Sequence, residues 1–95
     1  MSRTLSLVAL ALAFSLFAAP LRAQTNPLIE RGQSEYDELR YEEALQTLSA
    51  ALVRSGNSRS DLAQIYRLLA FTYLALGREE EAAGAYRGML PLDPE

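Results

Sequence analysis

Few side chains in this sequence could carry out chemistry. The chain has no His and no Cys, so the commonest general base and the commonest nitrogen and sulfur metal ligands are missing. Its carboxylates cluster at Glu42-Glu43 and at 79–81, where helices are expected to begin and the helix dipole accounts for negative charge. The serines between 55 and 60 have no adjacent base to activate them. We therefore expect no catalytic residue, no metal site and no cofactor, and a protein that is not an enzyme.

The elements that hold these side chains are predicted to be helices. Apolar residues recur at spacings of three and four, and no segment alternates with the period of two that marks a strand. Asn26 can cap a first helix that has Pro27 at its first position. The helix signals predict four helices: about 27–38, from Glu42 to a loop at 55–60, from a cap at Asp61 to Gly77, and from Glu79 to the residue before Pro91.

The first 23 residues have the order of a secretory signal peptide. Arg3 supplies a positive charge, residues 5–19 form an apolar run, and Ala23 precedes a plausible cleavage point at Gln24. The run is shorter than the roughly 20 apolar residues that span a bilayer. We expect removal of residues 1–23 and export to the periplasm or cell envelope. An uncleaved segment that anchors the protein in the membrane is the alternative.

The charge of the remaining chain excludes some partners. Without Arg3 and Arg22 it keeps seven Arg against twelve Asp and Glu, a net charge of −5. Binding of nucleic acid or of an anionic membrane surface requires an excess of positive charge. All basic residues are Arg, and together with abundant Ala and Leu this favours a GC-rich, bacterial genome.

The pattern of a helical hairpin occurs twice in the sequence. Ala44 and Ala82 hold the same place 38 residues apart, close to the 34-residue period of the tetratricopeptide repeat. The second copy carries the pattern of bulky and small positions best, at Tyr66, Leu69, Ala70, Tyr73, Gly77, Ala82, Tyr86 and Pro94. Residues 24–95 therefore resemble an exported bacterial member of the tetratricopeptide repeat family. The resemblance implies an all-α fold, an α-solenoid fragment of two tandem hairpins, unit one at about 25–58 and unit two at about 61–95.

The same resemblance implies a binding groove lined by the first helix of each unit. Its inner face would include Asn26, Ile29 and Leu74, and Phe71 either faces this groove or packs on a neighbouring helix. It implies a non-enzymatic scaffold that binds a protein or peptide, with no nucleic acid and no evident small-molecule substrate. The predicted partner-binding residues are Gln33, Tyr36, Asp37, Gln64, Arg67 and Phe71.

Two further interpretations stay open. The region could be an N-terminal assembly module, or a fragment, of a larger envelope protein whose working domain lies downstream. Tyr86, Met89 and Leu90 belong to the fourth helix, and no further helix follows to cover it within the chain. Because stacked repeats bury part of their apolar surface against the next unit, we expect self-association through this uncapped face.

Overall fold

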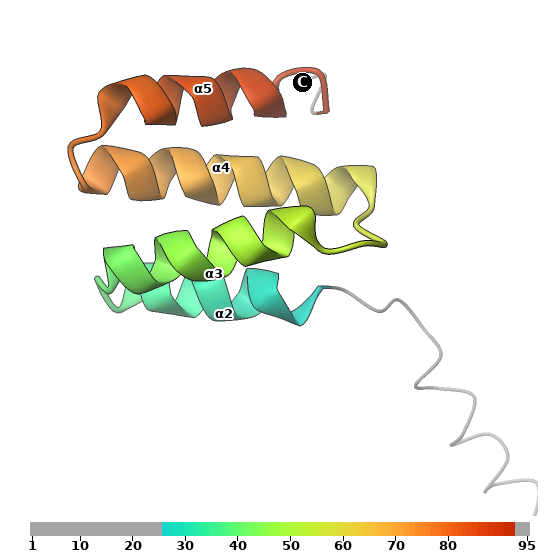
Figure 1. Cartoon of the computed structure of the whole chain (residues 1–95), viewed down its shortest axis with the longest axis horizontal. Coiled ribbons are helices and arrows are strands. Elements are labelled where there is room, and N and C mark those ends of the chain that lie inside the picture. The colour runs from blue at the N-terminus through green and yellow to red at the C-terminus, as the bar shows by residue number, and fades with distance from the viewer. Residues whose placement is uncertain (1–25, 93–95) are drawn as a thin grey trace, which may run out of the picture.

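A computed structural model describes residues 26–92 of the chain, and within them the fold is all-α, as predicted. The four helices are α2 (Pro27–Asp37), α3 (Tyr41–Val53), α4 (Arg59–Ala75) and α5 (Glu79–Met89). Consecutive helices run antiparallel and are joined by short turns (Figure 1). Within this part of the chain no helix has the length and apolar character to cross a membrane. The apolar run at 5–19 and the predicted cleavage site lie outside the described residues.

The α2 helix begins where the sequence predicted. The Oδ1 atom of Asn26 accepts a hydrogen bond from the backbone N–H of Leu28 at 3.0 Å, which satisfies one of the unpaired donors of the first turn. The Nδ2 atom of Asn26 donates to the carbonyl of Ala51 at 3.2 Å and to Oδ1 of Asn57 at 2.9 Å. This side chain therefore fastens the start of α2 to the end of α3 and to the loop that follows.

The predicted start of α4 was wrong by three residues. Ser58, not Asp61, is the N-cap, and its Oγ accepts from the N–H of Asp61 at 2.9 Å. The carboxylate of Asp61 in turn accepts from the N–H of Ser58 at 3.0 Å. This reciprocal capping box makes Asp61 the third helical residue and shortens the loop that was predicted at 55–60.

The α2–α3 and α4–α5 turns have the same hydrogen bonds. In the first turn, the N–H groups of Leu39 and Arg40 donate to the carbonyls of Tyr36 and Glu35. In the second, the N–H groups of the residues 38 positions further on, Gly77 and Arg78, donate to the carbonyls of Leu74 and Tyr73. Both are Schellman motifs, in which a left-handed residue ends the helix and its orphan carbonyls are satisfied.

Leu39 occupies the left-handed position of the first turn. Its φ is 65° and its side chain is 70 % exposed. Gly77 takes the same conformation in the second turn, with a φ of 76°. A glycine adopts this region without steric cost, whereas leucine does not. The first turn is therefore strained where the second is relaxed. The α3 helix then starts at Tyr41, one residue earlier than predicted.

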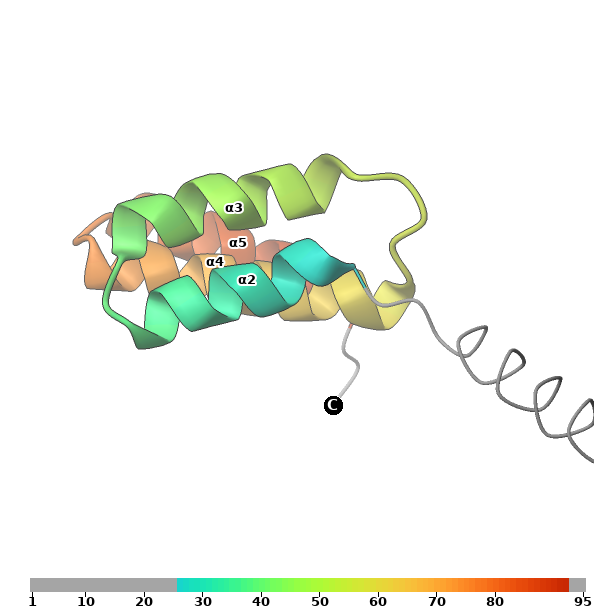
Figure 2. The same cartoon turned by 90° about the horizontal axis from the view of Figure 1, so that it is seen from below.

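Small residues let the helices approach closely in the core. Ala44 and Ala82, the pair that marked the repeat, are both buried. A Cβ on Gly32 would lie 2.5 Å from Cδ2 of Leu48, and one on Gly88 would lie 2.9 Å from Cε1 of Tyr66. Gly88 therefore faces α4. Each of α3, α4 and α5 packs on the helix before it, and α2 also contacts α4, as seen from below in Figure 2.

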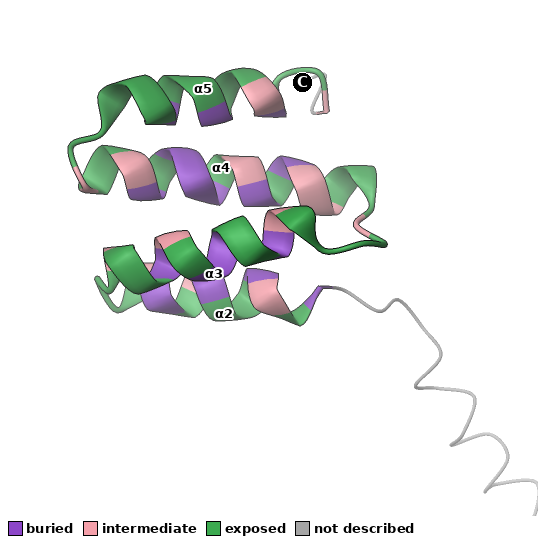
Figure 3. Ribbon diagram, viewed as in Figure 1, coloured by how far each residue is buried: buried purple, intermediate pink, exposed green. Residues whose placement is uncertain are grey.

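Much of the outer side of α5 is exposed (Figure 3). Met89 is buried, although it was expected on the uncovered side, whereas Tyr86 and Leu90 are 52 % and 48 % exposed. Ala85, next to Tyr86, lies in the core. The tyrosine lies on the side of α5 that a following helix would cover, and within the described residues none does.

Candidate binding groove

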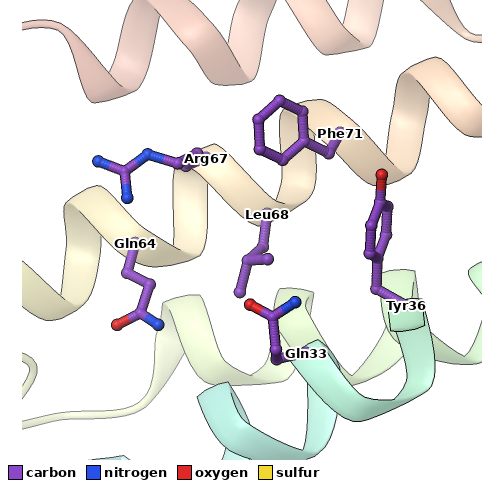
Figure 4. Close-up of a pocket in the computed structure, with 6 residues that line it drawn as sticks. All are labelled: Gln33, Tyr36, Gln64, Arg67, Leu68 and Phe71. Carbon is purple, nitrogen blue, oxygen red and sulfur yellow. The ribbon is translucent and has the colours of Figure 1, made fainter. Parts of the chain in front are cut away.

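An open pocket of about 290 Å³ lies between α2 and α4, the first helices of the two antiparallel pairs. Figure 4 shows the side chains of both helices converging on it. The α2 helix supplies two of them and α4 supplies four, spaced by three or four residues as one helix face requires. The lining residues are Gln33, Tyr36, Gln64, Arg67, Leu68 and Phe71.

Five of the six residues predicted to bind a partner line this pocket together. The sixth, Asp37, is exposed at the end of α2 and does not line it. Its Oδ1 instead accepts a hydrogen bond from Nε2 of Gln33 at 3.0 Å. Asp37 therefore orients an amide of the pocket without lining it.

Phe71 does both of the things that the sequence left open. Its ring is 46 % exposed, and its centroid lies 6.4 Å from that of Tyr36 with the planes tilted by 40°. Tyr36 is held from its other side by Tyr41, with centroids 5.4 Å apart in an edge-to-face arrangement. Aromatic rings at these separations attract one another. The two rings form one rigid wall of the pocket that still has free apolar surface.

Three residues that we expected on the inner face lie elsewhere. Asn26 is buried as the cap of α2, and Ile29 is a core residue that is 4 % exposed. Leu74 lines a second, apolar pocket of about 370 Å³ between α4 and α5. The prediction failed at Asn26 and Ile29 because α3 packs over the first turn of α2, and the sequence pattern alone did not place that contact.

Leu68 forms the floor of the pocket and was not among the predicted partner-binding residues. It is 4 % exposed and belongs to the core cluster, although its side chain also reaches the groove. A signal was available, because Leu68 follows Gln64 by four residues and precedes Phe71 by three, and so shares their face.

The pocket combines an apolar interior with polar groups at its edge. Leu68, Tyr36 and Phe71 present carbon atoms, while Gln33 and Gln64 bring amides that can both donate and accept. Arg67 adds a positive charge beside Gln64. Among residues 26–92, no three or more His, Cys, Asp or Glu side chains are grouped as a metal site would need.

An ion pair closes the α4–α5 turn, outside the pocket. The guanidinium of Arg78 hydrogen-bonds the carboxylate of Glu81, with Nε 3.0 Å from Oε1. This hydrogen bond lowers the pKa of Glu81 and raises the pKa of Arg78. The same guanidinium lies 5.1 Å from the ring centroid of Tyr73. Arg40 and Glu43 form the equivalent ion pair in the first turn, so both turns are closed in the same way.

The chain was compared with protein-family models, with curated protein sequences and with solved structures, and nothing matched. Membership of the tetratricopeptide family therefore remains a prediction from the residues quoted above.

Proposed function

We propose that this protein is an exported, non-enzymatic helical-repeat protein of the tetratricopeptide type that binds a protein or peptide through the α2–α4 pocket. The repeat assignment is supported by the two Schellman turns and their Arg–Glu pairs, which recur at an interval of 38 residues. Export rests on the sequence of residues 1–23. Mass spectrometry of the exported chain should find Gln24 at its N-terminus, and an intact Met1 in the membrane fraction would favour the anchored alternative.

The chemistry of the pocket fits a segment of extended polypeptide. An apolar side chain of the ligand would lie against Leu68 and the wall formed by the rings of Tyr36 and Phe71. The amides of Gln33 and Gln64 would hydrogen-bond the ligand backbone, which carries one donor and one acceptor per residue. Recognition through apolar anchors and a few placed polar groups is the usual design of such sites.

One observation carries this proposal. Residues 28 to 38 positions apart, from two helices that are not consecutive, meet around a single pocket, and one of them is a large apolar ring that stays half exposed. An exposed aromatic ring costs solubility without adding to the core, and aromatic residues are enriched among the anchors of binding sites.

The test is selection of peptides from a random display library, followed by titration of the best binder by fluorescence anisotropy. Phe71→Ala should weaken binding about tenfold or more, because the ring would bury its free apolar area against the ligand. Gln64→Ala should weaken it less. Val53→Ala is the matched control, since this side chain is 83 % exposed outside the pocket. Failure to select any peptide, or binding that is insensitive to Phe71, would refute the proposal.

A second candidate role is that of an assembly module within a larger envelope protein. The observation in its favour is the exposed apolar surface between α4 and α5, to which Leu74 and Tyr86 contribute. Size-exclusion chromatography of the protein from its native envelope would separate the two roles, because a module should migrate with the larger assembly.

A further inference from the structure

A second surface of the molecule is apolar and uncovered. It lies between α4 and α5, encloses the pocket of about 370 Å³, and is here named the α4–α5 face. Its large side chains are each about half exposed: Phe71, Leu74, Tyr86 and Leu90.

The first antiparallel pair, α2 and α3, has an equivalent face, and α4 packs on it. A shift of 38 residues, which superposes the two turns, carries Leu90 onto Leu52 and Tyr86 onto Leu48. Leu48 is fully buried and Leu52 packs on the same core, to which α2, α3 and α4 all contribute. The equivalent occupant of the α4–α5 face is therefore a helix that runs antiparallel to α5, as α4 runs antiparallel to α3 (Figure 1).

The α2 helix of another molecule does not fit this role. The buried residues of α4 include Ile65, Leu68, Leu69 and Thr72. The same shift places them on Pro27, Glu30, Arg31 and Ser34 of α2, all exposed. Head-to-tail stacking would press a polar and charged surface onto an apolar one, which costs the desolvation of those groups.

The α5 helix of a second copy does fit, because its charges are self-complementary. Glu80 and Arg87 are seven residues apart, so they lie on one side of α5 two turns from each other, and neither forms an ion pair within residues 26–92. Ala83 and Gly84 lie between them, and a Cβ on Gly84 would meet no atom closer than 3.9 Å. Two antiparallel α5 helices would thus approach closely at their centres.

The existing α3–α4 contact has the same charge pattern. Glu42, in the first turn of α3, attracts Arg78 just beyond the end of α4 and contributes to the raised pKa of Arg78, after the larger effect of its hydrogen bond with Glu81. The 38-residue shift carries Glu42 onto Glu80. In an antiparallel α5 pair, Glu80 would meet Arg87 near the end of the docked helix.

We propose that the protein forms a two-fold symmetric dimer through its α4–α5 faces. The two α5 helices pair antiparallel, Tyr86 of both copies lies near the centre of the contact, Leu90 of each copy packs at its end, and Glu80 of each copy faces Arg87 of the partner subunit. A closed two-fold contact buries the same patch on both copies and leaves no apolar face for further growth. The α2–α4 pocket shares only Phe71 with this face, and its other lining residues lie outside it, so most of each ligand site stays open in the dimer.

Charge reversal tests this pairing. Sedimentation equilibrium on the chain, purified in the form that the producing cell delivers, should show a monomer–dimer equilibrium. Glu80→Arg and Arg87→Glu should each weaken the dimer about tenfold or more, because two ion pairs become two like-charge contacts. The double variant, and a mixture of the two single variants, should restore it. Glu30→Arg, a reversal on the polar face of α2, should have no effect.

Two results would overturn the proposal. A wild-type monomer at millimolar concentration would mean that some other helix, or nothing, covers the α4–α5 face. A dimer that neither single reversal weakens would place the association on another surface. Circular dichroism of each variant guards against loss of the fold, and the rescue by the double variant cannot arise from unfolding.

Discussion

Replacement of Leu39 by glycine should stabilise the protein. Leu39 is left-handed, with a φ of 65°, and this conformation costs a non-glycine residue about 1–2 kcal/mol. Glycine removes that cost, but the greater entropy of its unfolded chain lowers the stability by roughly 0.5–1 kcal/mol. Little apolar burial is lost, because the side chain is 70 % exposed. The net gain is about 0.5–1 kcal/mol, or a rise in melting temperature of roughly 2–8 °C for a domain of this size.

The second turn provides the matched control. Gly77 occupies the equivalent position, and a Cβ there would meet no atom within 4 Å. Gly77→Leu should therefore lower stability by a similar amount for the backbone reason alone. Both variants are compared with the wild type by urea unfolding at one protein concentration, since association also changes apparent stability. A destabilising Leu39→Gly would show that the packing of this side chain outweighs its backbone strain, and equal effects of the same sign would refute the equivalence of the turns.

Two further predictions concern carboxylates. Glu35 is 4 % exposed and its Oε1 has no hydrogen-bond partner among the described residues. Glu35→Met should therefore raise the free energy of unfolding by about 1 kcal/mol, and Glu35→Gln should raise it less. A lower melting temperature for Glu35→Met would contradict this. The hydrogen bond from Arg78 lowers the pKa of Glu81 below its ordinary 4.5, so its stabilisation is complete above that pH and is lost as the pH falls through the lowered value. Glu81→Gln should abolish this part of the acid-induced loss, and urea unfolding at neutral pH and at pH values below 4.5 measures it; an unchanged difference between the two conditions would refute the pairing.

Most of the helical fold was predictable because its signals are local. Asn26 and Pro27 mark the start of α2, Gly77 marks the end of α4, and the small size of Ala44 and Ala82 reflects close helix contacts. The start of α4 was missed because Ser58 and Asp61 are both good caps, and only the reciprocal hydrogen bonds decide between them. A leucine in the place of a C-terminal glycine breaks the usual rule, and for that reason the left-handed turn at Leu39 was not predicted.

Most of the residues that line the pocket were predictable, but their detailed arrangement was not. Positions 33 and 36 on one helix and 64, 67 and 71 on another follow from helical spacing together with the family resemblance. That Leu68 forms the floor, and that Asp37 turns aside to hold Gln33, depends on the angle at which α2 and α4 approach each other. The exposure of Tyr86 likewise depends on what packs against α5, and helical spacing alone does not identify that partner.

Backbone amide chemical-shift mapping by NMR, with a selected peptide titrated into the labelled protein, tests the central claim most directly. The account predicts that the largest shifts occur along one stripe of α2 and one of α4, at Gln33, Tyr36, Gln64, Leu68 and Phe71, with little change at Ser49 and Ala50 on the exposed side of α3. Shifts concentrated on α3, or confined to the α4–α5 face, would contradict the assignment of the α2–α4 pocket as the binding site.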